Sequence, residues 1–334
     1  DKKQLFSTGF GRGGNIEHQQ SSLFWAMDNW LYSTVNAFRV RLTPDGKVIR
    51  ESTGSNGAQW GVTQDNYGKV YFQGGASGVP SYFQLPIVYG NFTVSDQFEQ
   101  GFTVPHGVAG VGDFQPGASA SRPDGTLNQV TGSAGSDVYR GDRLPADLVG
   151  DYFYGEPVAR IVRRVKVETT DGLTRMRNAY QKEQSEFIRS TDHLFRPVEM
   201  ETAPDGTLYI VDAYRGIIQE GNWTRPGSYL RRKIDQYQLD KVHSHGRIWR
   251  LTYDGIERDR RQPRMLEETP AQLVNHLEHR NGWWRDQAQK LLVLRQDKSV
   301  VPALRTMARS SGSEFGRIHA LWALEGLAAL DASL

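Results

Sequence analysis

The first three quarters of the chain alternate between apolar and polar residues in short runs, a pattern typical of half-buried β-strands. Four stretches share one form: a polar or proline-containing start, an alternating run, and a turn of the Asp-Gly or Asp-Asn kind. They cover residues 16–34, 56–74, 102–117 and 194–212, and in three of them an apolar strand follows the turn. These repeated units predict a mainly β fold.

The spacing of these stretches predicts a β-propeller. Tyr32 and Tyr71 end corresponding strands 39 residues apart, and Tyr209 follows Tyr71 by 138 residues, which is three times 46. Units of about 40 to 46 residues suit blades of four strands. Residues 1–256 hold about five such blades. We therefore expect a six-bladed propeller whose N-terminal part is missing from this chain, followed by a linker over 257–268.

The segments between these stretches predict the outer strands of the blades. Residues 37–51, 150–168 and 245–255 alternate apolar with basic side chains, as half-exposed strands do. Residues 172–190 are polar with few apolar positions, and we expect a long insertion or a short helix there.

After residue 268 the apolar period becomes that of an α-helix. Four amphipathic segments follow, at 269–279, 282–296, 299–310 and 314–330. Thr269 is the expected N-cap of the first, with Pro270 at its first helical position. The second and fourth segments match with a repeat of 32 residues, from Arg285 to Arg317. Residues 269–334 are thus expected to form truncated HEAT-like repeats that can dock a protein partner.

Composition narrows the functional classes. The 334 residues carry 40 Lys and Arg against 38 Asp and Glu, a net charge of +2, so no overall field favours nucleic acid or an anionic membrane. The absence of cysteine excludes a thiol nucleophile, thiolate metal sites and a CxxCH haem site within these residues. No P-loop, GxSxG or HExxH motif is present.

Polar residues at the starts of the expected inner strands are the candidate site, because inner strands of a propeller surround one mouth of its channel. A neutral imidazole can accept a proton, and a guanidinium can hold a carboxylate or an oxyanion. The alternative is that these groups only satisfy strand ends or line a wet channel. The candidates are His18, Arg196 and His106 for catalysis, and Gln59, Arg247 and His193 for cofactor binding.

A metal site is not predicted. His243 and His245 have a His-x-His spacing that suits metal binding, but no third ligand is placed by the sequence. The interpretation that they shape the start of a strand is preferred.

The order of several motifs resembles a known family. They are GFGRGGNIEHQQSSLFWAMDNWLY, SDVYRGDRLPADLVGDYFYGEPVARIVRR, LFRPVEMETAPDGTLYIVDAY, HSHGRIWRLTYDG, NGWWRDQAQKLL and RIHALWALEGL. Their order resembles the membrane-bound dehydrogenase family of PVC-type haem-binding proteins, large secreted bacterial proteins. In that family a propeller like that of glucose/sorbosone dehydrogenases precedes HEAT repeats and often a cytochrome c domain. The resemblance implies a periplasmic or extracellular location, with membrane association through other parts.

The expected propeller is also distantly similar to soluble aldose dehydrogenases that depend on pyrroloquinoline quinone (PQQ). There a His before an inner strand takes the proton of the sugar hydroxyl during hydride transfer to the quinone, and His18 in HQQSSLFWAMDNWLY matches that pattern. The resemblance implies PQQ and Ca²⁺ as cofactors. The Arg-Asn pair that holds the quinone there is not found at 57–61 or 103–107.

Two functions of different classes follow. The first is an extracytoplasmic sugar or polyol dehydrogenase that passes electrons to a quinone-type cofactor and a cytochrome c domain or partner. The second is a noncatalytic propeller and HEAT module that serves as a binding or scaffold subunit of a larger assembly.

Overall fold

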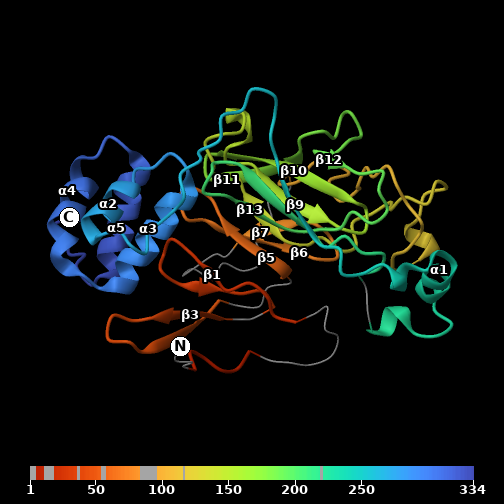
Figure 1. Ribbon diagram of the computed structural model, residues 1–334, viewed down its shortest axis with the longest axis horizontal. Helices are drawn as coiled ribbons and strands as arrows, with labels where there is room; N and C mark the ends of the chain where they lie inside the picture. The colour runs from red at the N-terminus through yellow and green to blue at the C-terminus, as the bar shows by residue number, and fades with distance from the viewer. Residues whose placement is uncertain are drawn as a thin grey trace.

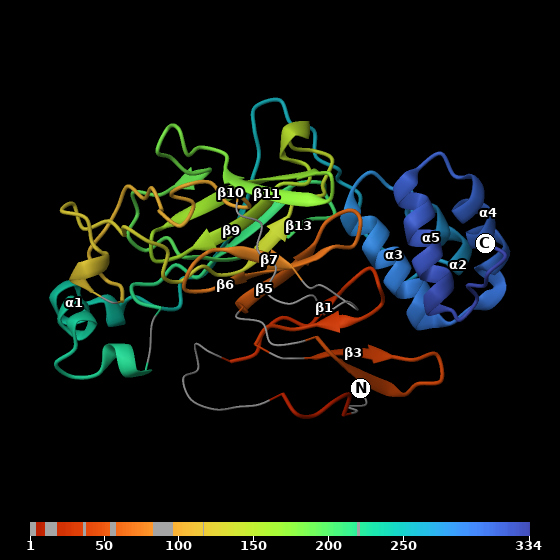
Figure 2. The ribbon, with the colours of Figure 1, turned by 180° about the vertical axis from the view of Figure 1, so that it is seen from behind.

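The computed structural model describes residues 5–10, 19–35, 38–53, 58–82, 96–115, 117–218 and 221–334. It shows a mostly β-sheet domain followed by a C-terminal helical segment. The helices α2 to α5 gather at one end of the molecule, and the short helix α1 lies at the opposite end (Figure 1). The view from behind shows the same order, with the sheets between the two (Figure 2).

The strands form four antiparallel sheets that follow one another along the chain. The first contains β1 (Phe24–Trp25), β2 (Leu31–Tyr32), β3 (Phe38–Leu42) and β4 (Val48–Ser52). The second contains β5 (Ala58–Gln64), β6 (Val70–Gly74) and β7 (Pro80–Tyr82). The third contains β8 (Ser136–Val138), β9 (Tyr152–Glu156), β10 (Ile161–Thr170) and β11 (Leu173–Asn178), with β12 (Ile188–Arg189) also paired to β10. The fourth contains β13 (Pro197–Thr202), β14 (Leu208–Asp212) and β15 (Arg247–Arg250).

The three stretches in which an apolar strand was expected after the turn form hairpins, β1–β2, β5–β6 and β13–β14. Their turns use the residues that the sequence indicated. Asn29 and Gly206 take positive φ values of 64° and 81°, a region that Asn and Gly adopt at low cost. Asp205 accepts from the backbone N–H of Thr207 at 3.1 Å, which closes the Asp-Gly turn.

The stretch 102–117 was predicted wrongly: its described residues form turns and irregular structure, not a strand. Several of its small residues are glycines, which allow close packing of the backbone and do not form a strand here. A Cβ on Gly110 would lie 2.0 Å from the carbonyl oxygen of Gly125, so this loop packs directly against its neighbour. Among the described residues, one sheet, the third, therefore lies between the sheet of Tyr71 and that of Tyr209. The described residues form four sheets, whereas the spacing predicted about five blades.

Two further segments differ from expectation. Residues 172–190 contain strand β11, which pairs with β10, and the short strand β12, so this segment extends a sheet and is neither an insertion nor a helix. Helix α1 (Tyr229–Tyr237) was not predicted; it buries Leu230 and Ile234 and is capped by Ser228.

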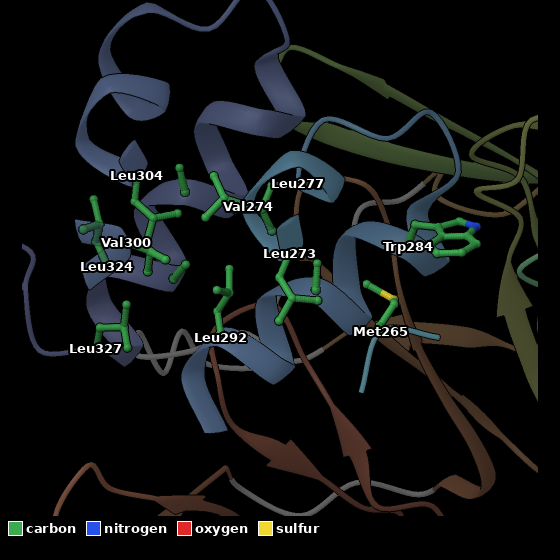
Figure 3. Close-up of a cluster of buried hydrophobic side chains, with 13 residues drawn as sticks. Met265, Leu273, Val274, Leu277, Trp284, Leu292, Val300, Leu304, Leu324 and Leu327 are labelled. Atoms are coloured by element: carbon green, nitrogen blue, oxygen red, sulfur yellow. The ribbon is translucent and has the colours of Figure 1, made fainter. Parts of the chain in front are cut away.

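The C-terminal segment contains the four helices that the period predicted. They are α2 (Pro270–His276), α3 (Gly282–Arg295), α4 (Val301–Ser310) and α5 (Glu314–Gly326). Thr269 and Gln272 form the capping box at the start of α2. Figure 3 shows the apolar side chains that meet between these helices. Leu273, Leu277, Leu304 and Leu324 are fully buried in this cluster.

The helices are joined to the sheets by buried polar contacts. Asn29 in the first hairpin donates to the carbonyl oxygen of Trp322 at 2.8 Å, and Gln289 of α3 donates to that of Met27 at 2.7 Å. At the fourth sheet, Trp284 of α3 donates its indole N–H to the carbonyl oxygen of Pro204, in the turn between β13 and β14, at 2.9 Å. The start of α3 is thereby fixed against the β domain.

In the part of the chain that is described, no helix combines the length and the apolar character needed to cross a membrane.

Replacing Leu304 by Ala should lower the free energy of unfolding by about 2–5 kcal/mol, because Leu304 is fully buried and the change leaves a cavity. The matched control is Leu294→Ala on α3, whose side chain is 44% exposed and should cost far less. Urea denaturation measures both. Equal losses would contradict the helical core described here.

Candidate functional site

A polar cleft lies where β1, β8 and β13 meet the first turns of α3. Its volume is about 160 Å³. The lining residues are Leu23, Phe24, Trp25, Asp137, Arg140, Glu201, Thr202, Trp283, Asp286, Gln287 and Lys290. We call it the acidic cleft, because three of its side chains are carboxylates.

Asp137 of β8 lies at the base of the acidic cleft, between two neighbouring sheets. Its Oδ1 accepts from the hydroxyl of Thr63 on β5 at 2.9 Å, and its Oδ2 accepts from the backbone N–H of Thr202 on β13 at 2.7 Å. Burial raises the pKa of Asp137 against these hydrogen bonds. Asp137 therefore ties the first strands of the second, third and fourth sheets together.

Two more carboxylates project from β13 beside Asp137. Burial and the nearby charge of Asp137 raise the pKa of Glu199 to about 7, although its carboxylate accepts from the backbone N–H of Met200 at 3.0 Å. Loss of solvation, followed by repulsion from Asp137 and Glu199, also raises the pKa of Glu201. Because Glu201 is exposed on the cleft, solvent screens part of this effect. Carboxyl groups in the cleft and beside it therefore have pKa values nearer to neutral pH than ordinary carboxyl groups.

The opposite wall is formed by an ion pair between the β domain and α3. Arg140, two residues after β8, donates through Nη1 to Oδ1 of Asp286 at 3.2 Å, and its Nη2 contacts Oδ2. Burial alone would raise the pKa of Asp286, but attraction to Arg140 and its hydrogen bonds hold this pKa below the ordinary value. Gln64 of β5 also donates to Asp286, at 3.3 Å.

His319 of α5 lies behind Asp286 and is fully buried. Burial lowers the pKa of His319 to about 3, so the ring is neutral at physiological pH. Its Nδ1 is 2.8 Å from Oε1 of Gln289, and its Nε2 lies 3.8 Å from Oδ1 of Asp286. The neutral ring leaves Arg140 as the cation that balances Asp286.

The composition of the acidic cleft determines what it can bind. Trp25 and Trp283 offer aromatic surface, and Glu201 offers hydrogen-bond acceptors that are open to solvent. Arg140 is already paired, which leaves Lys290 as the remaining cation of the lining. Such a site suits a neutral ligand with hydroxyl groups and disfavours an anion.

His18, the expected base, lies outside the described residues. Gln59 lies in strand β5, and its side chain also lies outside the description. Their roles stay predictions.

Arg196 is fully buried in a structural ion pair. Its Nη2 donates to Oδ2 of Asp113 at 2.6 Å, and Arg160 donates to the same carboxylate at 2.9 Å. The other donors of Arg196 contact the carbonyl oxygens of Pro157, Arg215 and Gly216. The exposed His193 meets this cluster only through its backbone carbonyl, which accepts from Arg160 at 2.9 Å. Arg196 has its guanidinium engaged inside the β domain, away from the lining of the acidic cleft.

His106 lies in the irregular loop before β8 and not at the start of a strand. Its backbone N–H donates to Glu186 at 3.0 Å, and Glu186 forms a fully buried ion pair with Arg163. Burial lowers the pKa of the His106 ring, whose Nε2 is 3.5 Å from Oε1 of Gln181. His106 and Arg196 thus join different ion pairs.

Arg247 is exposed on strand β15, where its guanidinium stacks over the ring of Tyr214 at 3.4 Å. His243 contacts the hydroxyl of Ser244 at 3.0 Å. Across the described ranges, no group of three or more His, Cys, Asp or Glu residues is placed to hold a metal ion.

The sequence reasoning missed the acidic cleft. Asp137 and Arg140 stand in the motif SDVYRGD, and Glu199 and Glu201 alternate along the strand VEMET, but each motif looked architectural on its own. The alternating glutamates were the available signal, because charged residues are uncommon at two successive inward positions of an inner strand.

The sequence comparisons identify the family. Residues 1–255 match the family described as "Domain of unknown function (DUF7133)", and the chain belongs to that family. The comparison with curated proteins gives no significant match.

Among solved structures, the chain is similar to a virginiamycin B lyase from Staphylococcus aureus, with 12% identity, a TM-score of 0.30, and coverage of 60% of this chain and 52% of that one. It is also similar to a streptogramin B lyase structure, with 14% identity, a TM-score of 0.27, and coverage of 59% and 49%. The chain therefore spans about half the length of these structures.

Replacing Glu199 by Gln should flatten the pH dependence of stability. The pKa of Glu199 rises from an ordinary 4.5 to about 7 on folding, so the folded state binds this proton more tightly than the unfolded state. The resulting stabilisation is present below pH 4.5 and is lost as the pH rises to about 7. Above that pH, Glu199→Gln should be more stable than the parent by up to about 3 kcal/mol.

Urea denaturation at pH values between about 5 and 8 measures this effect. Glu257→Gln, at an exposed carboxylate, is the control and should follow the parent. Parallel profiles for the parent and Glu199→Gln would refute the assignment.

Replacing Asp286 by Asn should lower the free energy of unfolding by about 3–5 kcal/mol, because Arg140 is left buried without its anion. The control is Glu267→Gln, which removes an exposed pair with Arg264 and should change stability by about 1 kcal/mol or less. Denaturation at neutral pH compares them. Similar small losses would mean that the pair does not hold α3 in place.

Proposed function

We propose that the chain recognises a sugar or a related polyol in the acidic cleft, as the substrate-binding part of an extracytoplasmic dehydrogenase-like protein. The observation that carries the proposal is the combination of indole surface and solvent-open carboxylate in one small cleft. Sugar rings present apolar C–H faces to aromatic rings, and their hydroxyl groups donate to carboxylates.

The size of the acidic cleft supports a small ligand. Its volume of about 160 Å³ is below the roughly 300–1,000 Å³ of pockets for drug-sized molecules. A ligand of about one sugar ring is the appropriate scale. The charge of the lining disfavours an anionic ligand, because Asp137, Glu201 and Asp286 outnumber Arg140 and Lys290.

PQQ does not fit the acidic cleft. This quinone carries three carboxylates and needs cationic partners, whereas the cleft presents its own carboxylates and Arg140 is already paired with Asp286. For Ca²⁺, the described residues provide no cluster of three acidic ligands. No step through either cofactor is derived from this cleft.

The oxidation of a hydroxyl group and electron transfer to a quinone-type cofactor and a cytochrome c partner stay predictions that rest on the family resemblance. Glu201 can accept the hydroxyl proton when its carboxyl group is ionised, and its raised pKa makes that carboxylate a stronger base than an ordinary one. The arrangement of the first strands supports consecutive propeller blades, since β5 packs beside β8 and β8 beside β13. The pairing of α2 with α3 and of α4 with α5 supports HEAT-like repeats.

The second candidate is a noncatalytic binding or scaffold subunit. The engagement of Arg196 with Asp113 and backbone carbonyls favours it, because that guanidinium is unavailable to a substrate. The extensive junction between α3 and the sheets also favours a fixed platform.

Titration calorimetry against a panel of neutral sugars and polyols tests the proposal. We expect a neutral sugar to bind the parent, and both Trp283→Ala and Glu201→Gln to weaken it about tenfold by removing aromatic surface or an acceptor. Trp223→Ala, at a 39% exposed indole outside the lining, is the control.

Equal binding by all variants would place the sugar site elsewhere. If no sugar or polyol of the panel binds the parent, the sugar proposal fails and the noncatalytic scaffold remains as the candidate function. Dye reduction by the parent with a bound sugar separately tests the dehydrogenase chemistry.

A further inference from the structure

Strand β15 forms an exposed edge of the fourth sheet. All four of its residues are exposed, including Ile248 at 69% and Trp249 at 46%. Val211, which is opposite Ile248 on β14, is also exposed at 37%. Among the described residues, β15 pairs with β14 alone, whereas the first and third sheets each continue to a fourth strand.

The register of β15 shows which backbone groups are available for pairing. Leu251 donates its N–H to the carbonyl oxygen of Leu208 at 2.9 Å, so this opposed pair is hydrogen-bonded. Because hydrogen-bonded and non-bonded pairs alternate in antiparallel sheets, the N–H and C=O groups of Ile248 and Arg250 point away from β14. An added strand would find two donors and two acceptors at this edge.

The surface beyond the C-terminal end of β15 is basic. A hollow of about 410 Å³ is lined by Arg250, Thr252, Ile256, Glu257, Arg258 and Arg260. Arg250 lies 3.8 Å from Asp205, whereas Arg258 and Arg260 have no ion pair within the described residues. Glu257 is the acidic member of this lining. A negatively charged side chain at this end would therefore be attracted.

Strand β4 is also exposed, but its surroundings differ. Arg50 of β4 contacts the carbonyl oxygen of Thr8 and stacks over Phe38 at 3.9 Å, and Glu51 is paired with Arg39. The edge of β4 is thus occupied by contacts with another segment of the chain and by paired charges. Strand β15 combines outward-pointing backbone groups with exposed apolar side chains, and Arg258 and Arg260, which have no ion pair within the described residues, lie just beyond it.

We propose that β15 binds an extended segment of a partner polypeptide, which adds a strand to the fourth sheet. Ile248 and Arg250 are two residues apart and lie on the same face, so the segment would carry an apolar residue and an acidic residue at alternate positions. Backbone hydrogen bonds would provide the affinity, and these two side chains would select the sequence. This interaction is independent of the sugar proposal, because β14 lies between β15 and β13, the strand of this sheet that lines the acidic cleft.

Fluorescence anisotropy with labelled peptides of about eight residues tests the proposal. In the first peptide Val and Thr alternate, so that Val lies on one face of the strand, and one Val is replaced by Glu. The others replace Glu by Lys, or carry N-methyl groups on alternate backbone nitrogens. The Glu peptide should bind the full chain at least about tenfold more tightly than either of the others.

Two variants of the protein identify the site. Ile248→Pro removes an outward-pointing N–H on an edge strand, where proline is tolerated, and should weaken the Glu peptide at least about tenfold. Ile248→Val keeps the N–H and should bind like the parent. Arg250→Glu should reverse the preference between the Glu and Lys peptides, because Arg250 is the cation that faces the acidic residue of the segment.

Strand addition can still be tested if Ile248→Pro does not fold, because the N-methylated peptide removes backbone hydrogen bonds to β15 by a change in the peptide and not in the protein. Equal binding of the parent to the N-methylated peptide would overturn strand addition. Failure of every peptide to bind the parent would also overturn it. A dimer in sedimentation that Ile248→Pro abolishes would show that a second copy occupies this edge, and not a partner.

Discussion

The buried ion pair between Arg140 and Asp286 holds the helical segment on the sheets, and the acidic cleft depends on it. A buried charge is costly unless its partner is close, so Arg140 requires the first turns of α3 to lie against β8. The backbone repeats this contact, since the N–H of Gly282 donates to the carbonyl oxygen of Arg140 at 2.8 Å. A Cβ on Gly282 would lie 2.9 Å from that of Arg140, and glycine thus permits the close approach.

The position of α3 in turn controls the electrostatics of the cleft. Asp286 takes up the charge of Arg140, which leaves Asp137, Glu199 and Glu201 without a dedicated cation. Loss of solvation raises the pKa values of all three, and repulsion between carboxylates adds to this at Glu199 and Glu201, whereas attraction to Arg140 lowers the pKa of Asp286. One ion pair therefore both fixes the wall of the cleft and leaves its base rich in protonatable carboxylates.

Local signals in the sequence predicted the elements but not the site. The hairpins follow from turn residues such as Asn29 and Gly206, and the helices from their period and the cap at Thr269, because these effects act within a few residues. The sequence of 102–117 has the alternating pattern of a strand, but its glycines allow close backbone packing, and its described residues form an irregular loop. Asp137 and Asp286 belong to different segments of the chain, and only the junction of α3 with the sheets brings them together.

The fourth sheet connects two surfaces of different chemistry. Its first strand, β13, presents Glu201 and Thr202 at the cleft, and its last, β15, presents exposed Ile248 and Arg250. The middle strand, β14, is anchored by buried Leu208 and Ile210 and separates the two surfaces. A partner strand on β15 would extend the sheet outward without covering the cleft. Loss of one of the two proposed interactions should therefore leave the other measurable, which distinguishes a proposed substrate-binding subunit docked in an assembly from a proposed scaffold that only docks.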